Sequence, residues 1–200
     1  MTNKVFIIDD DPAMQVYLSR LLARRGYDTA LHSSAEEFLE QLKPSSSGCV
    51  LADQRLPGMT GIELQVELKA RECELPVIII TGYSDVATAR GAFLAEAVDF
   101  ISKPVKADQL QAALERALKI ERKRVQSIRR REKHENALAL LTRRERELLD
   151  LVGRGLLIHE IAAKMKIQPR TVETHKFNIM KKLGARNTPD LVRFALEESK

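Results

Sequence analysis

The first 118 residues repeat one pattern, in which a short apolar run is followed by an amphipathic stretch of helical period. The five runs are Val5-Phe6-Ile7-Ile8, Thr29-Ala30-Leu31, Cys49-Val50-Leu51-Ala52, Val77-Ile78-Ile79-Ile80 and Phe100-Ile101. Four of them are continuous rather than alternating in polarity, which is typical of parallel strands covered on both faces. Five strand-then-helix units in succession predict a doubly wound α/β domain.

Helix start signals support this interpretation: Pro12 follows an acidic cluster, and Ser34-Ala35-Glu36-Glu37 forms a capping box. From Ala107 a helical pattern continues past the expected end of the domain. Its apolar positions are Leu110, Leu114, Ala117, Ile120, Val125 and Ile128. The almost wholly charged residues 129–136 come next. We interpret this stretch as a helical linker whose charges form a solvated face, in preference to a dedicated DNA contact.

The last segment has four helical patterns and no predicted strand. Thr142-Arg143-Arg144-Glu145 is a capping box that opens the first helix, and Pro169 and Thr188-Pro189 open the third and fourth. The residues expected to face inward in the second, third and fourth helices are Ile158, Ile161, Ala162, Met165, Val172, Ile179, Leu183, Leu191, Ala195 and Leu196. This half is therefore predicted to be a separate all-α domain.

Charge divides the 200-residue chain in the same place. Residues 1–118 hold 12 basic and 17 acidic side chains, whereas residues 119–200 hold 21 and 11, so the net charge of +5 hides an acidic and a basic half. A basic half suits phosphate partners such as DNA. The two cysteines lack metal-ligand spacing, and no apolar run approaches the roughly 20 residues of a membrane span, so we expect a cytoplasmic protein.

Acidic residues follow two of the predicted strands. Asp9, Asp10 and Asp11 come directly after the first strand, and Asp53 follows the third. Ligands of an open parallel sheet gather beyond the carboxyl ends of its strands, so these carboxylates converge if the two strands are neighbours. Crowded carboxylates repel one another and recruit a hard divalent cation such as Mg²⁺.

The fourth and fifth strands end at Thr81, a hydroxyl donor, and Lys103, a cation suited to phosphate. With the carboxylates and Mg²⁺, these groups supply what in-line phosphoryl transfer needs, and Asp53 is the natural nucleophile. Taken singly, an Asp at a strand end is more often a helix cap, and Lys103 would pass for a surface lysine. Their occurrence together at successive strand ends favours the functional interpretation.

The motifs at these strand ends resemble those of a two-component receiver domain. They are Asp9-Asp10-Asp11, Asp53 followed by Leu56-Pro57-Gly58-Met59-Thr60-Gly61, Ile80-Thr81-Gly82, and Phe100-Ile101-Ser102-Lys103-Pro104. The resemblance implies a flavodoxin-like sheet of five parallel strands in the order 2-1-3-4-5. It also implies that Asp53 accepts phosphate from a sensor histidine kinase.

The same resemblance assigns roles to the other site residues. Mg²⁺ is expected on Asp10, Asp53 and the backbone carbonyl of Arg55, with Asp9 acting partly through water. Thr81 and Lys103 would hold the phosphoryl group. Phe100 would be an aromatic switch that rotates inward, although by itself an ordinary core residue is the simpler interpretation. Two positions depart from the receiver pattern: Gly91 falls inside the predicted fourth helix, and Glu96 stands just after it in place of a glycine, so we expect this helix to be mobile.

The third helix of the basic half has a face suited to the major groove. Arg170, Glu173, Thr174, Phe177 and Lys181 share it, and Lys176 and Lys182 flank it as candidate phosphate contacts. A charged face is usually only solvated, but an exposed phenylalanine beside a threonine favours contact with thymine methyl groups.

Several motifs of this half resemble the LuxR-type helix-turn-helix, and the whole chain is similar to FixJ/NarL-type regulators. The motifs are Leu141-Thr142-Arg143-Arg144-Glu145-Arg146-Glu147, Glu160-Ile161-Ala162, Arg170-Thr171-Val172-Glu173-Thr174-His175 and Ile179-Met180-Lys181-Lys182-Leu183. The resemblance implies a receiver at 1–120, a linker at 121–137 and a DNA-binding domain at 138–200. It makes 158–165 the scaffold helix and 169–183 the recognition helix. Expected partners are double-stranded DNA, the kinase, RNA polymerase as a further candidate, and a second copy of the chain after phosphorylation.

Two positions depart from the helix-turn-helix pattern, and two other functions remain open. Leu157 and Gln168 stand where serine usually caps the helices, so each start is expected to lose about 1 kcal/mol of capping. A phosphatase with an aspartyl nucleophile would need a second carboxylate two residues after it, where this chain has Arg55. A phosphate-independent interaction module is the other alternative. We expect a regulator and not an enzyme.

Overall fold

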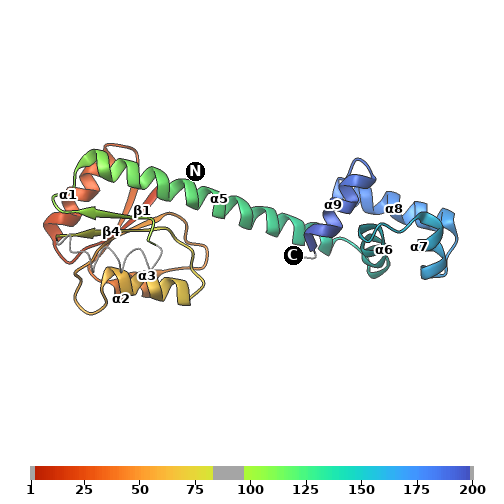
Figure 1. Cartoon of the computed structure of the whole chain (residues 1–200), viewed down its shortest axis with the longest axis horizontal. Helices are drawn as coiled ribbons and strands as arrows, with labels where there is room; N and C mark the ends of the chain where they lie inside the picture. Colours follow the sequence, from red (N-terminus) through yellow and green to blue (C-terminus); the bar gives the residue numbers. More distant parts are fainter. Residues whose placement is uncertain (1–2, 83–96, 199–200) are drawn as a thin grey trace. The chain divides into compact units, whose positions relative to one another are not determined.

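The computed structural model describes residues 3–82 and 97–198, and its residues divide into two compact units between Gln126 and Ser127 (Figure 1). The predicted mobile fourth helix, with Gly91 in it and Glu96 after it, lies outside the described residues. Within the described ranges, no helix combines the length and the apolar character that a membrane crossing requires.

The first unit is built on a five-stranded parallel sheet with the order β2-β1-β3-β4-β5. The strands are β1 (Lys4–Ile8), β2 (Asp28–His32), β3 (Cys49–Asp53), β4 (Val77–Thr81) and β5 (Asp99–Ser102). Every residue of β3 and β4 is buried, as expected for central strands covered on both faces. The predicted strands and their order are confirmed.

Helices cover both faces of this sheet and close two apolar cores. The helices α1 (Pro12–Ala23) and α5 (Ala107–Ala139) pack on one face, and α2 (Ala35–Gln41) and α3 (Gly61–Ala70) pack on the other (Figure 1). Pro12 opens α1 as predicted. Ser34 caps α2 by accepting from the N–H of Glu37, but the carboxylate of Glu37 binds Ser33 and not Ser34, so only half of the predicted capping box forms.

The 33-residue helix α5 continues beyond the first unit without a break, which confirms the predicted long helix. Its apolar stripe differs from the prediction. Leu110, Leu114 and Ala117 are buried, but Ile120 is 47% exposed and Ile128 is also exposed. The buried position after Leu118 is instead Glu121. The domain boundaries at 120 and 137 stay a prediction.

The second unit contains α6 (Arg143–Gly153), α7 (Ile158–Met165), α8 (Pro169–Leu183) and α9 (Thr188–Glu198) around one apolar core. The predicted inward residues of α8 are buried, but Leu196 of α9 is exposed, contrary to expectation. The capping box of Thr142 and Glu145 is present. Neither Leu157 nor Gln168 makes a side-chain cap, as predicted.

At the start of α7 the lost cap is partly replaced from within the helix. The carboxylate of Glu160 accepts a 2.7 Å hydrogen bond from the N–H of Leu157. One orphan donor of the helix start is therefore satisfied by a residue three positions along the chain.

Candidate functional site

Three carboxylates meet beyond the carboxyl ends of β1 and β3, which are neighbours in the sheet. One oxygen each from Asp9, Asp10 and Asp53 lies within 4.8 Å of the others. Asp9 and Asp53 are buried, whereas Asp10 is exposed. The sequence prediction that these side chains converge is confirmed, and Asp11, which followed the same strand, is used differently.

Asp11 is the N-cap of α1 and accepts a 2.8 Å hydrogen bond from the N–H of Ala13. Its own N–H donates to Asp9 Oδ1 at 2.9 Å. Burial of Asp9 disfavours its ionised form and raises its pKa, although this bond and the charge of Lys103 oppose the shift. The hydrogen-bond donors around Asp9 therefore do not fully offset the effect of burial on its ionised form.

Lys103, directly after β5, reaches back into this acidic cluster. Its Nζ lies 2.5 Å from Asp53 Oδ2 and 3.4 Å from Asp9 Oδ2. Burial alone would lower the pKa of Lys103, but the hydrogen bond and charge of Asp53 raise it above its ordinary value. One ammonium group thus faces three carboxylates, which leaves the cluster with an excess of negative charge.

Thr81 and Arg55 also lie next to the acidic cluster. Thr81 is buried at the end of β4, and its carbonyl accepts a 2.6 Å bond from the N–H of Lys103, so the two chain segments lie side by side. The N–H of Arg55 donates to Asp53 Oδ1 at 3.3 Å. Phe100 on β5 is half-buried against the α2–α3 core. The ligand role of the Arg55 carbonyl and the switch role of Phe100 stay predictions.

The loop after β3 passes close beneath the strand end. A Cβ atom at Gly61 would lie 2.6 Å from the carbonyl oxygen of Asp53, so only glycine allows this approach. The N–H of Gly61 bonds to the carbonyl of Gln54 at 3.3 Å. The loop that begins at Asp53 is therefore closed by the first residue of α3.

Gln15 is a site residue that sequence analysis missed. Its Nε2 donates to the carbonyl of Asp9 at 2.8 Å and to the carbonyl of His32 at 2.9 Å. It thereby ties the aspartate-bearing turn to the end of β2. A glutamine in the first turns of an amphipathic helix carries no signal for such a contact, because the partner lies 17 residues away in the chain.

The oxygen-rich donor set fits a hard divalent cation. Two buried and one exposed carboxylate present oxygens at close range, and the one ammonium group of Lys103 contacts two of them. Oxygen ligands of this kind suit Mg²⁺, which keeps part of its water shell.

In the second unit, α8 presents the predicted polar face. Val172, Ile179 and Leu183 are buried. The exposed residues are Arg170, Glu173, Thr174, Phe177 and Lys181, and Lys176 is half-buried. Phe177 is 66% exposed, so its ring is accessible to a partner. The hydroxyl of Thr174 donates to the carbonyl of Arg170 at 3.0 Å, so a base contact would fall to its methyl group.

Lys182 differs from the expected phosphate contact. Its Nζ lies 2.7 Å from a carboxylate oxygen of Glu145, which is buried at the start of α6. Burial alone would raise the pKa of Glu145, but Lys182 and the N–H and hydroxyl of Thr142 hold it at about 2. Lys182 therefore joins α8 to α6 within the unit. The sequence marked Glu145 as a capping residue but could not identify its cation.

Comparison with known proteins agrees with both units. The family model of the response regulator receiver domain matches residues 5–115, and that of bacterial regulatory proteins of the luxR family matches residues 139–195. The transcriptional regulatory protein FixJ of Bradyrhizobium diazoefficiens is 37% identical over 198 residues, which cover 98% of this chain and 97% of that protein. The response regulator protein TodT of Pseudomonas putida is 35% identical, covering 94% of this chain and 83% of TodT.

Solved structures give the same result. The response regulator StyR has a TM-score of 0.87 at 35% identity, covering 97% of this chain and 98% of StyR. Full-length FixJ from B. japonicum has a TM-score of 0.58 at 36% identity, covering 98% and 97% of the two chains. The chain therefore belongs to the two-component response regulators, as a FixJ-like transcriptional regulator with a LuxR-type DNA-binding domain.

Proposed function

We propose that Asp53 accepts a phosphoryl group from a sensor histidine kinase and that this modification changes the binding of double-stranded DNA by α8. The observation that carries the proposal is the position of Asp53, whose carboxylate contacts Lys103 and lies among the acidic cluster at the sheet edge. The receiver family supports phosphate acceptance, and the LuxR-type family supports DNA binding. The acidic cluster provides the carboxylates that the phosphoryl transfer needs.

In the transfer step, a carboxylate oxygen of Asp53 forms a bond to phosphorus, and the phosphorus–nitrogen bond of a phosphohistidine donor breaks. The electron pair stays on the imidazole nitrogen, and Asp53 becomes an acyl phosphate. The ammonium group of Lys103, which contacts Asp53 before the transfer, then binds the phosphoryl oxygens. The hydroxyl of Thr81 donates to the same oxygens, and Phe100 turns inward in response.

Asp9, Asp10, Asp53 and the carbonyl of Arg55 would hold Mg²⁺, which would neutralise charge on the transferring phosphoryl group. The crowded carboxylates favour this ion, because each of them is stabilised by an added positive charge. Asp9 gains most, since its ionised form is destabilised by burial.

On the DNA side, we propose that the exposed face of α8 enters the major groove. Glu173, Thr174 and Phe177 would contact base edges, and Arg170, Lys176 and Lys181 would contact phosphates or bases. Lys182 has the smallest share in this surface because Glu145 binds its ammonium group. Residues 1–120, 121–137 and 138–200 would act as receiver, linker and DNA-binding domain, with RNA polymerase and a second phosphorylated copy as partners.

Intact-mass measurement tests the phosphorylation. The full chain, incubated with Mg²⁺ and a small-molecule acyl phosphate, should gain one phosphoryl group, and Asp53→Ala should gain none. Asp11→Asn is the matched control, because Asp11 caps α1 and should leave the modification intact. Continuous phosphate release would favour a phosphatase, and no modification of the wild-type protein would favour a phosphate-independent module.

Salt titration tests the DNA surface. On a duplex that the phosphorylated protein selects from a random-sequence library, Lys176→Ala should weaken binding and reduce the slope of log affinity against log salt by about 1. Thr174→Ala should alter sequence preference and leave the slope unchanged. Identical effects of the two variants would contradict the assignment of the α8 face.

A further inference from the structure

Glu121 interrupts the apolar face by which α5 packs on the first unit. Leu114, Ala117 and Leu118 are buried apolar residues, and Glu121 follows at the spacing that keeps it on the same face. It is 1% exposed. After it, the next buried residue of α5, a helix that the structure describes throughout, is Leu138. The last buried contact of α5 in the first unit is therefore an ionisable group in a place where leucine would be expected.

Four hydrogen bonds satisfy the Glu121 carboxylate. Ser47 Oγ and the N–H of Gly48 donate to Oε1 at 2.6 and 3.0 Å. Arg124 donates through Nη2 to Oε1 at 2.8 Å and through Nε to Oε2 at 2.7 Å. Arg124 Nη2 also donates to the carbonyl of Ser46 at 3.1 Å. We name Glu121, Arg124 and residues 46–48 the helix clamp. Although burial alone would raise the pKa of Glu121, Arg124 and Ser47 lower it, so the group is ionised.

The loop of the helix clamp passes close to β1. Gly48 has a φ of +149°, and a Cβ atom there would collide with the carbonyl oxygen of Lys4 on β1. The next residue begins β3, which ends at Asp53. The proposed phosphoacceptor and the loop that grips α5 thus occupy opposite ends of one fully buried strand.

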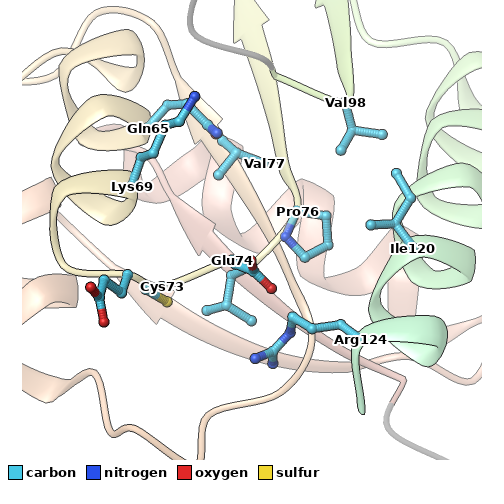
Figure 2. Close-up of a pocket in the computed structure, with 11 residues that line it drawn as sticks. Gln65, Lys69, Cys73, Glu74, Pro76, Val77, Val98, Ile120 and Arg124 are labelled. Carbon is cyan, nitrogen blue, oxygen red and sulfur yellow. The ribbon is translucent and has the colours of Figure 1, made fainter. Parts of the chain in front are cut away.

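Apolar packing of α5 against the first unit is weak near the helix clamp. Figure 2 shows Ile120 and Arg124, one turn apart on α5, lining a groove whose far wall includes Gln65 and Lys69 of α3. Ile120 remains 47% exposed there. Apolar packing therefore contributes little after Leu118, and the hydrogen bonds of the helix clamp decide the course of α5 as it leaves the unit. Such bonds are directional, whereas apolar contacts tolerate sliding.

We propose that Glu121 and Arg124 are positioning residues that fix α5 on the first unit. We further propose that phosphorylation of Asp53 changes DNA binding only while the hydrogen bonds of the helix clamp are formed. This inference rests on the proposed function. It separates two properties of the chain: the ability to accept phosphate, which needs the acidic cluster, and the ability to transmit it, which needs the helix clamp as well.

Hydrogen exchange of the full chain tests the positioning directly. Glu121→Gln should raise the exchange rates of amides 119–126 and 46–48 at least about tenfold, because the negative charge is lost and one accepting oxygen becomes an amide group that cannot accept from Arg124 or Ser47. Glu115→Gln makes the same chemical change at an exposed position of α5 and should leave those amides unchanged. Equal exchange in the two variants would overturn the proposal whether or not Asp53 is phosphorylated.

A second variant separates positioning from stability. Glu121→Leu combined with Arg124→Leu replaces both members of the ion pair, and replacing a whole buried ion pair by well-packed apolar residues is often neutral or stabilising. We expect it to fold and to accept phosphate at the wild-type level. The wild-type ratio of DNA affinities with and without phosphate should be roughly 5–150-fold, a usual allosteric range, and the variant's ratio should fall to within about twofold of one.

The outcomes distinguish the two proposals. A full wild-type ratio in the double variant Glu121→Leu/Arg124→Leu would refute the role of the helix clamp and leave the proposed function standing. Failure of the wild-type chain to accept phosphate would refute the proposed function, while the exchange experiment would still decide the positioning.

Discussion

Asp9 of the first unit and Glu145 of the second are both buried carboxylates, yet their surroundings shift their pKa values in opposite directions. Asp9 is 1% exposed, receives one backbone hydrogen bond, and meets Lys103 only at 3.4 Å, so burial raises its pKa. Glu145 is 4% exposed, but Lys182 and Thr142 supply close donors, and its pKa falls to about 2.

The difference separates a carboxylate that serves structure from one that serves binding. Glu145 has its donors within its own unit, so nothing further is required for its ionised form. Asp9 lies beside two other carboxylates and has only Lys103 at 3.4 Å to offset its charge, so a bound cation would stabilise its ionised form. A depressed and a raised pKa thus mark a completed and an incomplete site in one chain.

The largest effect should come from removing the completed carboxylate. Glu145→Ala should lower the free energy of unfolding of the second unit by about 3 kcal/mol, because it leaves Lys182 and the start of α6 without their partner. Hydrogen exchange of core amides in α6 and α8 of the full chain measures this. Glu147→Ala is the control, since its pair with Arg144 is exposed. A loss below about 1 kcal/mol would show that Glu145 contributes no more than a surface ion pair.

Glu145 also gives a signed dependence on pH. Its folded-state pKa lies below its ordinary value of 4.5, so its stabilisation is complete above about pH 4.5 and is lost as the pH falls toward 2. This slope should vanish in Glu145→Ala.

The next effect concerns the incomplete site. Asp9→Asn should weaken Mg²⁺ binding by roughly 10–100-fold, because it removes a buried negative charge from the donor set. Asp11→Asn changes the neighbouring carboxylate that caps α1 and should retain the wild-type affinity for Mg²⁺. Titration calorimetry with MgCl₂ measures both variants. Similar affinities in both would mean that the acidic cluster binds the ion without Asp9.

The smallest effect is the pH dependence of the metal-free first unit. Because the folded-state pKa of Asp9 is raised, its contribution to stability is present below pH 3.8 and is lost as the pH rises through the raised value. The slope has the opposite sign to that of Glu145. Chemical unfolding in the presence of a chelator should show it in the wild-type chain and not in Asp9→Asn. Saturating Mg²⁺ should abolish it by stabilising the ionised form.

Much of the fold follows from patterns that are local in sequence. Short apolar runs identified the five strands, and Pro12, Thr142 and Pro169 marked the starts of helices. The convergence of Asp9, Asp10 and Asp53 could also be predicted, because neighbouring parallel strands bring their carboxyl ends to one edge whatever the loops between them do.

Contacts between distant residues could not be predicted in this way. Ile120 was predicted to continue the apolar stripe of the long helix, but Ile120 is exposed and its neighbour Glu121 is buried instead. Glu121 is buried because residues 46–48 contact α5 at this point. The periodicity of the helix carries no information about that contact. Lys182 likewise appeared as one of several free cations, and only the fold brings it to a glutamate 37 positions away.

The position of the helix clamp also matters for building chimaeras. A fusion that joined a foreign output module directly after Leu118 would keep every apolar residue with which α5 packs on the sheet, yet it would discard Glu121 and Arg124. We expect such a hybrid to accept phosphate normally without any change in the activity of its output module. A fusion point after Gln126 would keep the whole helix clamp in the new protein.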